Sequence, residues 1–402
     1  MRLDRVVNDL LVRVFWIQRR LDPYLRPALD HVVKPPVEAV VQWLARRRLP
    51  DHHLALAEER LLDGEAEVTR RIVALQTRFL DTTYPPGSHV ERAGNTKTYG
   101  VLRGVLTVHP ELPVRVRHGL FAAPGSYPAW VRCAGPGPLT PPDLRDNAIM
   151  SLGVKVMGVP GPKLLPDERG TQDFLCLSQP TFTTPDVLAN EILQQEVGNR
   201  TGLMYFLRPS HPHLLDLIMS GLYAVTAASP LQVPYWSCVP YLLGEGQAMQ
   251  YRFVPRARPL KVPRRPGPDY LREAMVRTLA EQDVVLDMLL QLQTDPRRMP
   301  IEHAGIVWSP RRSPPITVAT LTLPRQRFDS PAQLAFADAL SFNPWHALAE
   351  HRPLGNQGRA RRVVYAELAR ARQQRNNVPH IEPTGEETFG DIRLESCEQR
   401  SR

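Results

Sequence analysis

The sequence predicts an α+β protein, with a mostly antiparallel β core that is wrapped and followed by helices. Amphipathic helical patterns occupy the first 80 residues. From residue 98, short apolar runs separated by proline- and glycine-rich turns indicate strands. Helical patterns return after residue 330. The chain has 402 residues, 43% of them hydrophobic, which is enough for a sizeable core, and its 41 prolines indicate long turns.

The first 80 residues are expected to form a helical arm, with helices over 3–17, 34–50 and 57–80. The first helix places its apolar residues on one face: Leu3, Val6, Val7, Leu10, Leu11 and Val14. Two interpretations of this face stay open. The helix either packs on its own domain or on a partner subunit of a homo-oligomer, or it lies in a membrane surface as a peripheral contact through residues 1–20.

Strands are predicted in the middle of the chain, at 98–108, 129–134, 147–159, 172–178, within 234–255 and at 314–324. Helices are predicted within 186–226, at 268–293, at 330–340 and from 358 to about 375. These elements suggest an arm (1–80), a β core with helical insertions (81–330), C-terminal helices (331–376) and a polar tail (377–402).

The formal net charge of +9 favours anionic partners. The basic residues are mostly arginines spread along the chain without an RNA-binding signature, so nucleic acid is not an expected partner. Four cysteines without CxxC pairing indicate reduced thiols: Cys133, Cys176, Cys238 and Cys397. Charged residues interrupt the first 20 positions, which does not fit a secretory signal. A cytoplasmic location is expected, with membrane association left open.

The segment "RARRVVYAELARAR" (359–372) places Tyr365 four residues after Arg361 and seven before Arg372. On a helix turning ~100° per residue, the three lie within about 40° of one another. A free phenol ionises only near pH 10. To bind ferric iron as phenolate it needs nearby positive charge, which an arginine one turn earlier supplies. Tyrosine is the axial haem ligand of catalases, although the short motif alone also fits a solvated basic face.

Longer stretches resemble the catalase superfamily, in particular its shorter, catalase-related branch, which includes allene oxide synthases. The similar stretches are "YPAWVRCA" (127–134), "DNAIMSLGVKVMGVPGPKLLPDERGTQDFL" (146–175), "LTLPRQRFDSP" (321–331) and "FNPWHALAEHRPLGNQGRARRVVY" (342–365). The resemblance extends over about residues 85–375 and leaves the first 50 residues unexplained. It implies a catalase-like antiparallel β-barrel with surrounding and C-terminal helices, and a haem b cofactor with its iron.

The resemblance also assigns roles to single residues. It implies that Tyr365 is the proximal ligand of the iron and that Arg361 is the arginine beside it. Arg92, Arg132 and Arg372 fall where the family places contacts to the haem propionates, carboxylates that arginine forks bind well.

The distal side departs from the family. Catalases carry an arginine, two residues and then a histidine, but counting from Arg92 in "ERAGNTKTYGVL" (91–102) places Asn95 at the histidine position. An amide does not take up a proton at neutral pH, whereas general acid–base help is worth ~10²–10⁴-fold. Efficient disproportionation of hydrogen peroxide is therefore not expected. Thr96 has the opposite strand parity, and His89 would lie about 20 Å away along an extended strand.

A second departure lies in "LSQPTF" (177–182), where Ser178 or Gln179 stands near the position of the family's distal asparagine. Of the two phenylalanines that the family places after the proline, only Phe182 remains.

The favoured interpretation is a haem-dependent enzyme that transforms organic hydroperoxides, fatty acid hydroperoxides in particular, by O–O cleavage at a tyrosinate-ligated iron. Asn95 would orient the peroxide, and Arg361 would set the electron density at the iron. The reaction class is that of a peroxidase-like oxidoreductase or of a hydroperoxide lyase or isomerase. The alternatives are a weak catalase or peroxidase acting on hydrogen peroxide and a non-catalytic haem-binding homologue.

Overall fold

The computed structural model describes residues 2–49, 54–146, 149–257 and 260–389. Three features considered above lie outside this range: the first two residues of the strand expected at 147–159, Cys397 and the end of the polar tail.

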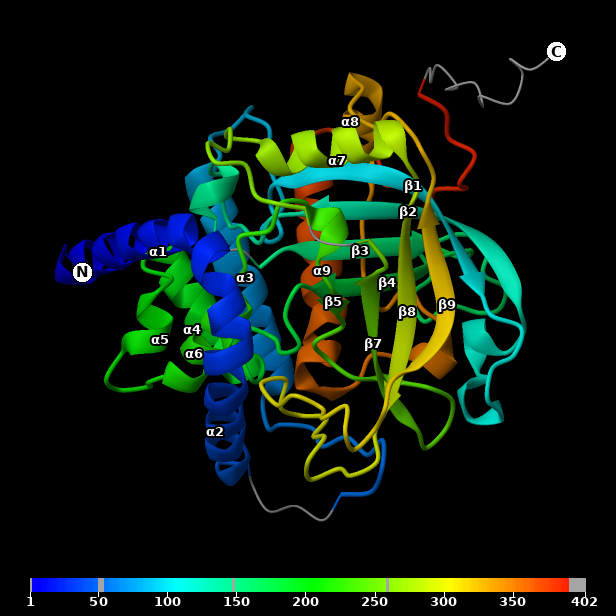
Figure 1. The fold of residues 1–402 in the computed structure, drawn as a ribbon, viewed down its shortest axis with the longest axis horizontal. Helices are drawn as coiled ribbons and strands as arrows, with labels where there is room; N and C mark the ends of the chain where they lie inside the picture. The colour runs from blue at the N-terminus through cyan, green and yellow to red at the C-terminus, as the bar shows by residue number, and fades with distance from the viewer. Residues whose placement is uncertain (1, 50–53, 147–148, 258–259, 390–402) are drawn as a thin grey trace.

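Among the described residues, eight antiparallel strands close into a barrel in the order β5-β4-β3-β2-β1-β9-β8-β7, with β5 pairing back to β7 (Figure 1). The short strand β6 pairs with β7. The strands are β1 (Thr98–Val108), β2 (Gly125–Ala134), β3 (Ser151–Val156), β4 (Gln172–Leu177), β5 (Tyr235–Trp236), β6 (Tyr241–Leu242), β7 (Ala248–Pro255), β8 (Val284–Leu292) and β9 (Ile316–Leu323). The predicted α+β class and the antiparallel β-barrel are thus confirmed.

The helix predicted over 268–293 is wrong in its second half. Helix α7 (Tyr270–Glu281) ends before β8, which pairs with β7 on one side and β9 on the other. Buried and partly exposed residues alternate along β8, which is the period of a strand with one buried face. Both faces carry apolar residues, and this hid the alternation in the sequence.

Helices cover the barrel outside its strands. They are α3 (Glu65–Thr83), α4 (Val187–Gly198), α5 (Met204–Leu207), α6 (Leu214–Tyr223), α8 (Pro331–Ala339) and α9 (Gly355–Arg375). Short turns of helix are η2 (Val114–Val116), η3 (Gly119–Phe121), η4 (Asp143–Arg145), η5 (Pro230–Gln232) and η6 (Ala349–His351). The helix predicted to start at residue 57 starts at 65, directly after Gly64, whose φ of +73° cannot continue a helix.

Apolar residues pack on both sides of the β1–β4 sheet. Leu102 and Val131 belong to the large core inside the barrel. On the outer face, Val101 and Trp130 pack with Phe342, and Tyr365 of α9 packs against the same cluster. Antiparallel pairing therefore places the outer side of β1 and β2 against the helix that carries the tyrosine.

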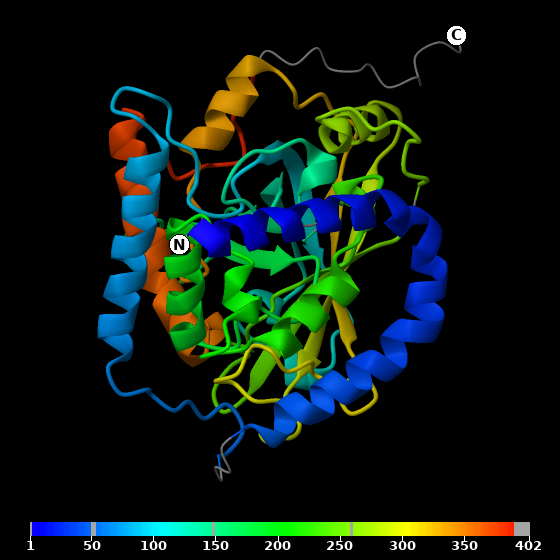
Figure 2. The ribbon, with the colours of Figure 1, turned by 90° about the vertical axis from the view of Figure 1, so that its left-hand side faces the viewer.

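The N-terminal arm consists of α1 (Arg2–Ala28) and α2 (Lys34–Arg47), joined by a π-helical turn η1 (Leu29–Val33). Figure 2 shows the arm curving around one side of the molecule. Prolines at 27, 35 and 36 flank the junction and remove backbone donors there, which accounts for the wider turn. Within the part of the chain that the structure describes, no helix has the length and apolarity to cross a membrane.

Candidate functional site

Helix α9 presents Arg361 and Tyr365 together. The Nη2 atom of Arg361 donates a hydrogen bond of 3.1 Å to the Tyr365 hydroxyl. The start of α9 is held by buried polar contacts, because the Asn356 side chain accepts from the backbone N–H of Val187 at 2.9 Å and donates to Glu302. These contacts fix the rotation of the helix and so direct the arginine–tyrosine pair inward.

Arg361 is almost fully buried, and its Nε and Nη1 atoms have no hydrogen-bond partner among the described residues. Burial opposes its charge, but the hydroxyls of Tyr365 and Tyr241 raise the pKa of Arg361 above its usual value. Its guanidinium carbon lies 5.8 Å from the centre of the Phe182 ring. Arg361 is therefore a buried cation with unused donors next to a phenol.

Arg92, Arg132 and Arg372 converge at the C-terminal end of α8. Arg92 Nη2 donates to the carbonyls of Ala337 and Leu340 at 2.8 and 2.7 Å. Arg372 donates to the carbonyls of Asp338 and Leu340. The carbonyls at a helix C-terminus carry partial negative charge, which partly compensates the arginines.

Arg132 reaches the same place from β2. Its Nε and Nη2 atoms donate to Thr98 Oγ1 at 3.1 and 2.7 Å, and Nη2 also donates to the Asn95 carbonyl at 2.7 Å. Burial and the charge of Arg372 lower the pKa of Arg132 to about 10. Burial, followed by the charges of Arg372 and Arg132, lowers the pKa of Arg92 well below its usual value. We call these three residues the arginine cluster; its mutual repulsion favours binding of an anion.

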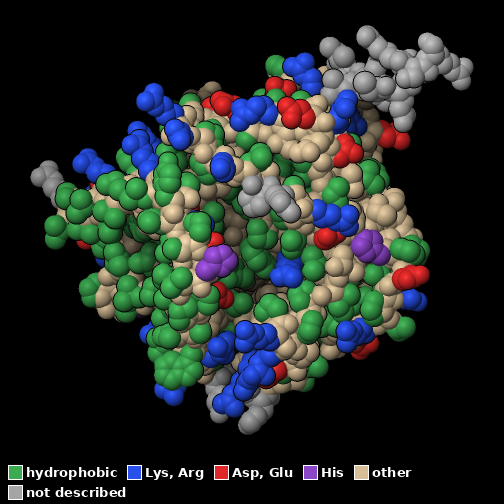
Figure 3. All heavy atoms as spheres, viewed as in Figure 1, with side chains coloured by type: hydrophobic (Ala, Val, Ile, Leu, Met, Phe, Trp, Pro, Cys, Tyr) green, Lys and Arg blue, Asp and Glu red, His purple; other side chains and the backbone are tan. Residues whose placement is uncertain are grey.

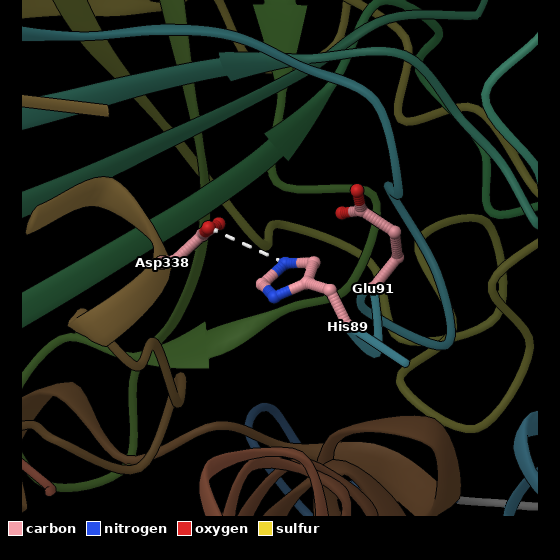
Figure 4. A group of neighbouring side chains, drawn as sticks. All are labelled: His89, Glu91 and Asp338. Carbon is pink, nitrogen blue, oxygen red and sulfur yellow. Dashed lines mark ion pairs between the residues drawn. The ribbon is translucent and has the colours of Figure 1, made fainter. Parts of the chain in front are cut away.

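Sequence reasoning missed an acidic group beside the arginine cluster, formed by His89, Glu91 and Asp338 (Figure 4). His89 Nε2 lies 3.4 Å from Asp338 Oδ2. Burial and the charge of Asp338 raise the pKa of Glu91. Glu91 is next to Arg92 in the sequence, but Asp338 is far from it, so only the fold reveals the group.

Glu91 and Asp338 line a cavity of about 410 Å³ together with Lys97, Thr98 and Arg272. Thr98 is the residue that holds Arg132. The cavity therefore lies next to the arginine cluster, with Glu91, Thr98 and Asp338 in its wall.

The approach to β1 is not the extended strand on which the distal positions were counted. β1 begins at Thr98, and Asn95 has a φ of +48° in the preceding turn. Its backbone N–H donates to the Pro136 carbonyl at 2.9 Å. Thr96 is buried, and its hydroxyl donates back to the Arg92 carbonyl. The extended strand on which the parity of Thr96 and the separation of His89 were based is therefore wrong, and the Asn95 carbonyl accepts a hydrogen bond from Arg132.

The two candidates for the distal amide position differ. Ser178 Oγ accepts from the Met150 backbone N–H at 2.9 Å and so serves the pairing of β3 with β4. Gln179 is fully buried, and its Oε1 atom has no hydrogen-bond partner within the described ranges. Phe182 packs on the barrel core and faces Arg361. Gln179 is thus the one of the two with an unused polar atom.

These observations fit a haem. The arginine cluster favours carboxylates such as propionates, and Arg361 keeps buried donors beside a tyrosine oxygen. Both features sit on elements that the fold brings to one side of the β1–β2 sheet.

Comparisons with known proteins concern the whole fold. Neither a protein-family model nor a curated protein matches the sequence. Catalase A from Saccharomyces cerevisiae aligns with a TM-score of 0.58 and 13% identity, over 85% of this chain and 72% of that chain. A fungal catalase gives 0.57 and 14%, over 85% and 70%. A bacterial catalase gives 0.54 and 15%, over 83% and 67%. Since the identities are this low, the likeness concerns architecture: the chain has the fold of the catalases.

Proposed function

We propose that this protein is a haem-dependent enzyme that acts on peroxides, in which Tyr365 would bind the haem iron. The observation that carries the proposal is the hydrogen-bonded pair of the buried Arg361 and the partly buried Tyr365 on α9. The three-arginine cluster on the same side of the sheet supports it. When bound, haem supplies an iron centre able to cleave an O–O bond.

The chain's own residues have distinct tasks in this proposal. Arg361 donates to the Tyr365 oxygen and places a buried positive charge beside the atom that would bind the iron. Arg92, Arg132 and Arg372 would hold the haem propionates. The carbonyls of α8 and the Thr98 hydroxyl fix the direction of these guanidinium groups. The arginine side chains therefore lose little conformational entropy when an anion binds.

The proposed substrate class is an organic hydroperoxide, in particular that of a fatty acid, as in the catalase-related branch. The support is Asn95, which stands in the place of the family's histidine. Its amide group would bind and orient a peroxide but transfers no proton. A reaction that needs no proton transfer between the two peroxide oxygens suits this site better than hydrogen peroxide disproportionation.

The first experiment is the visible spectrum of the full chain, purified from cells supplied with a haem precursor. We expect a Soret band with a high-spin ferric, phenolate-type pattern, which Tyr365→Phe loses. Tyr24→Phe, at a tyrosine that is 74% exposed on the arm, is the control and keeps the spectrum. A protein that stays colourless after haem is added would contradict the proposal.

Substrate assays on the haem-loaded protein then separate the reactions. Consumption of a fatty acid hydroperoxide without oxygen release from hydrogen peroxide supports the proposed class. Oxygen release alone indicates the weak catalase alternative. Bound haem without either activity indicates the non-catalytic homologue.

A further inference from the structure

Helix α1 packs on the rest of the protein with its polar side. The buried residues Asn8 and Asp22 accept from the backbone N–H groups of Leu203 and Thr226, at 3.1 and 2.7 Å. Arg26 donates to the carbonyls of Leu222 and Ala224 at 3.0 and 2.8 Å. A surface helix usually turns its apolar side to the core. In α1 the orientation is the reverse, and these hydrogen bonds fix it.

The outward side of α1 is apolar. Residues between 49% and 74% exposed follow one another along it: Leu3, Val6, Leu10, Val14, Ile17, Leu21 and Tyr24. At ~100° per residue they fall within an arc of about 80°, along a helix about 40 Å long. We call this row the α1 stripe. Val40 and Trp43 of α2 are also about half exposed, and Figure 3 shows hydrophobic side chains gathered over the arm.

Basic residues accompany the apolar surface. Arg13 and Arg20 are exposed, and the helical geometry places them about 20–40° beyond one edge of the α1 stripe. Arg47 covers the Trp43 ring at 3.9 Å at the end of α2. A 27-residue helix with an apolar stripe bordered by arginine has the composition of helices that lie in a lipid headgroup region.

Two partners could cover this apolar surface, a second copy of the chain or a lipid surface, and electrostatic complementarity favours the lipid surface. A second copy of a chain with net charge +9 would bring arginine-bordered surfaces together. An anionic lipid surface instead offers an acyl-chain region in which the α1 stripe can be buried and negatively charged headgroups for the arginines. We propose that α1 and the end of α2 dock the protein flat on an anionic lipid surface. This inference goes beyond the proposed function and holds with or without haem.

The test is co-sedimentation of the full chain with vesicles of phosphatidylcholine containing phosphatidylglycerol, compared with phosphatidylcholine alone. The stripe variant is Leu10→Glu/Val14→Glu/Ile17→Glu, at exposed positions where charge leaves the core untouched. The matched control is Val114→Glu, at an apolar residue that is 78% exposed in η2 on another part of the molecule. Circular dichroism checks the fold, and light scattering gives the oligomeric state.

We expect the wild type and Val114→Glu to bind anionic vesicles, and the stripe variant to bind at least about tenfold less. Arg13→Gln/Arg20→Gln should weaken binding to the anionic vesicles while leaving the weak binding to phosphatidylcholine alone. Equal binding by wild type and the stripe variant would overturn the proposal. A wild type that does not bind vesicles would also overturn it. If that wild type forms a dimer, and the stripe variant is a monomer, the α1 stripe is a subunit interface instead.

Discussion

Arg361 and Tyr365 lie one turn apart on α9 and are joined by a hydrogen bond of 3.1 Å. Their spacing in the sequence predicted that they would lie on the same face of a helix, and the structure places them in contact. The arginine has no other hydrogen-bond partner for its Nε and Nη1 atoms within the described residues. The Tyr365 hydroxyl is therefore the main partner of the Arg361 guanidinium. Replacing Arg361 should change the haem binding attributed to Tyr365 more than it changes the stability of α9.

Arg361→Leu removes the donor and the charge beside Tyr365. We expect weaker haem retention, by at least about tenfold, and a shifted visible spectrum, because the Tyr365 oxygen loses both its hydrogen-bond donor and the positive charge beside it. Arg361→Lys should restore part of the spectrum. The readouts are haem content after gel filtration and the spectrum, with Arg370→Leu on the exposed side of α9 as control. An unchanged spectrum in Arg361→Leu would show that the pair plays no part in binding.

Asn95→His should raise oxygen release from hydrogen peroxide toward the ~10²-fold that a general acid–base group supplies. The φ of +48° at Asn95 suits the substitution, because histidine tolerates the left-handed region better than most residues. Asn95→Ala, which adds no proton carrier, serves as control. If haem stays bound and turnover does not rise, the Asn95 side chain does not face the iron.

The stability of the fold should depend on His346. Its Nδ1 and Nε2 atoms lie 3.0 and 3.1 Å from Asp173 Oδ2 and Asp167 Oδ2. Burial opposes its charge, but hydrogen bonds with these carboxylates raise the pKa of His346 to about 9, from 6.5. Because the charged form is favoured in the folded state, its contribution is complete below about pH 6.5 and is lost as the pH rises through about 9.

His346→Gln should therefore flatten the decline of unfolding free energy between pH 6.5 and 9, which in the wild type is on the order of 2–3 kcal/mol. Urea unfolding across this range measures it. The exposed His211→Gln is the control and should keep the wild-type slope. If His346→Gln keeps that slope too, the histidine is not the group that titrates.

Gly100→Ala should destabilise the start of β1. A Cβ at this position would lie 2.5 and 2.6 Å from two ring carbons of the buried Phe328, so the ring or the strand must move. We expect a loss of about 1–3 kcal/mol in the free energy of unfolding, measured by denaturant titration. Gly94→Ala, where a Cβ has no atom within 4 Å, should cost little. Equal midpoints for the two variants would contradict the packing argument.

Local patterns predicted much of the fold. The period of α9 and the turns around β1 to β4 were readable because each pattern is set by nearby residues. The boundary between α7 and β8 was not, since the outer face of β8 carries Val285 and Leu289 as well as Asp287, and these apolar residues hide the alternation. The acidic group was hidden because Glu91 and Asp338 meet only in the folded chain. The apolar side of α1 was predicted, but its outward direction depends on the distant Leu203 and Thr226.

Strand β1 pairs along one edge with β2 and along the other with β9, whose residues follow more than 200 positions later. The arginine cluster has the same division, since Arg92 and Arg132 come early in the chain while Arg372 and α8 come near its end. During synthesis, Arg92 and Arg132 therefore emerge long before Arg372 and before the α8 carbonyls that accept from Arg92. A ligand that contacts all three arginines therefore binds only after residue 372 has been synthesised, near the end of translation or after it.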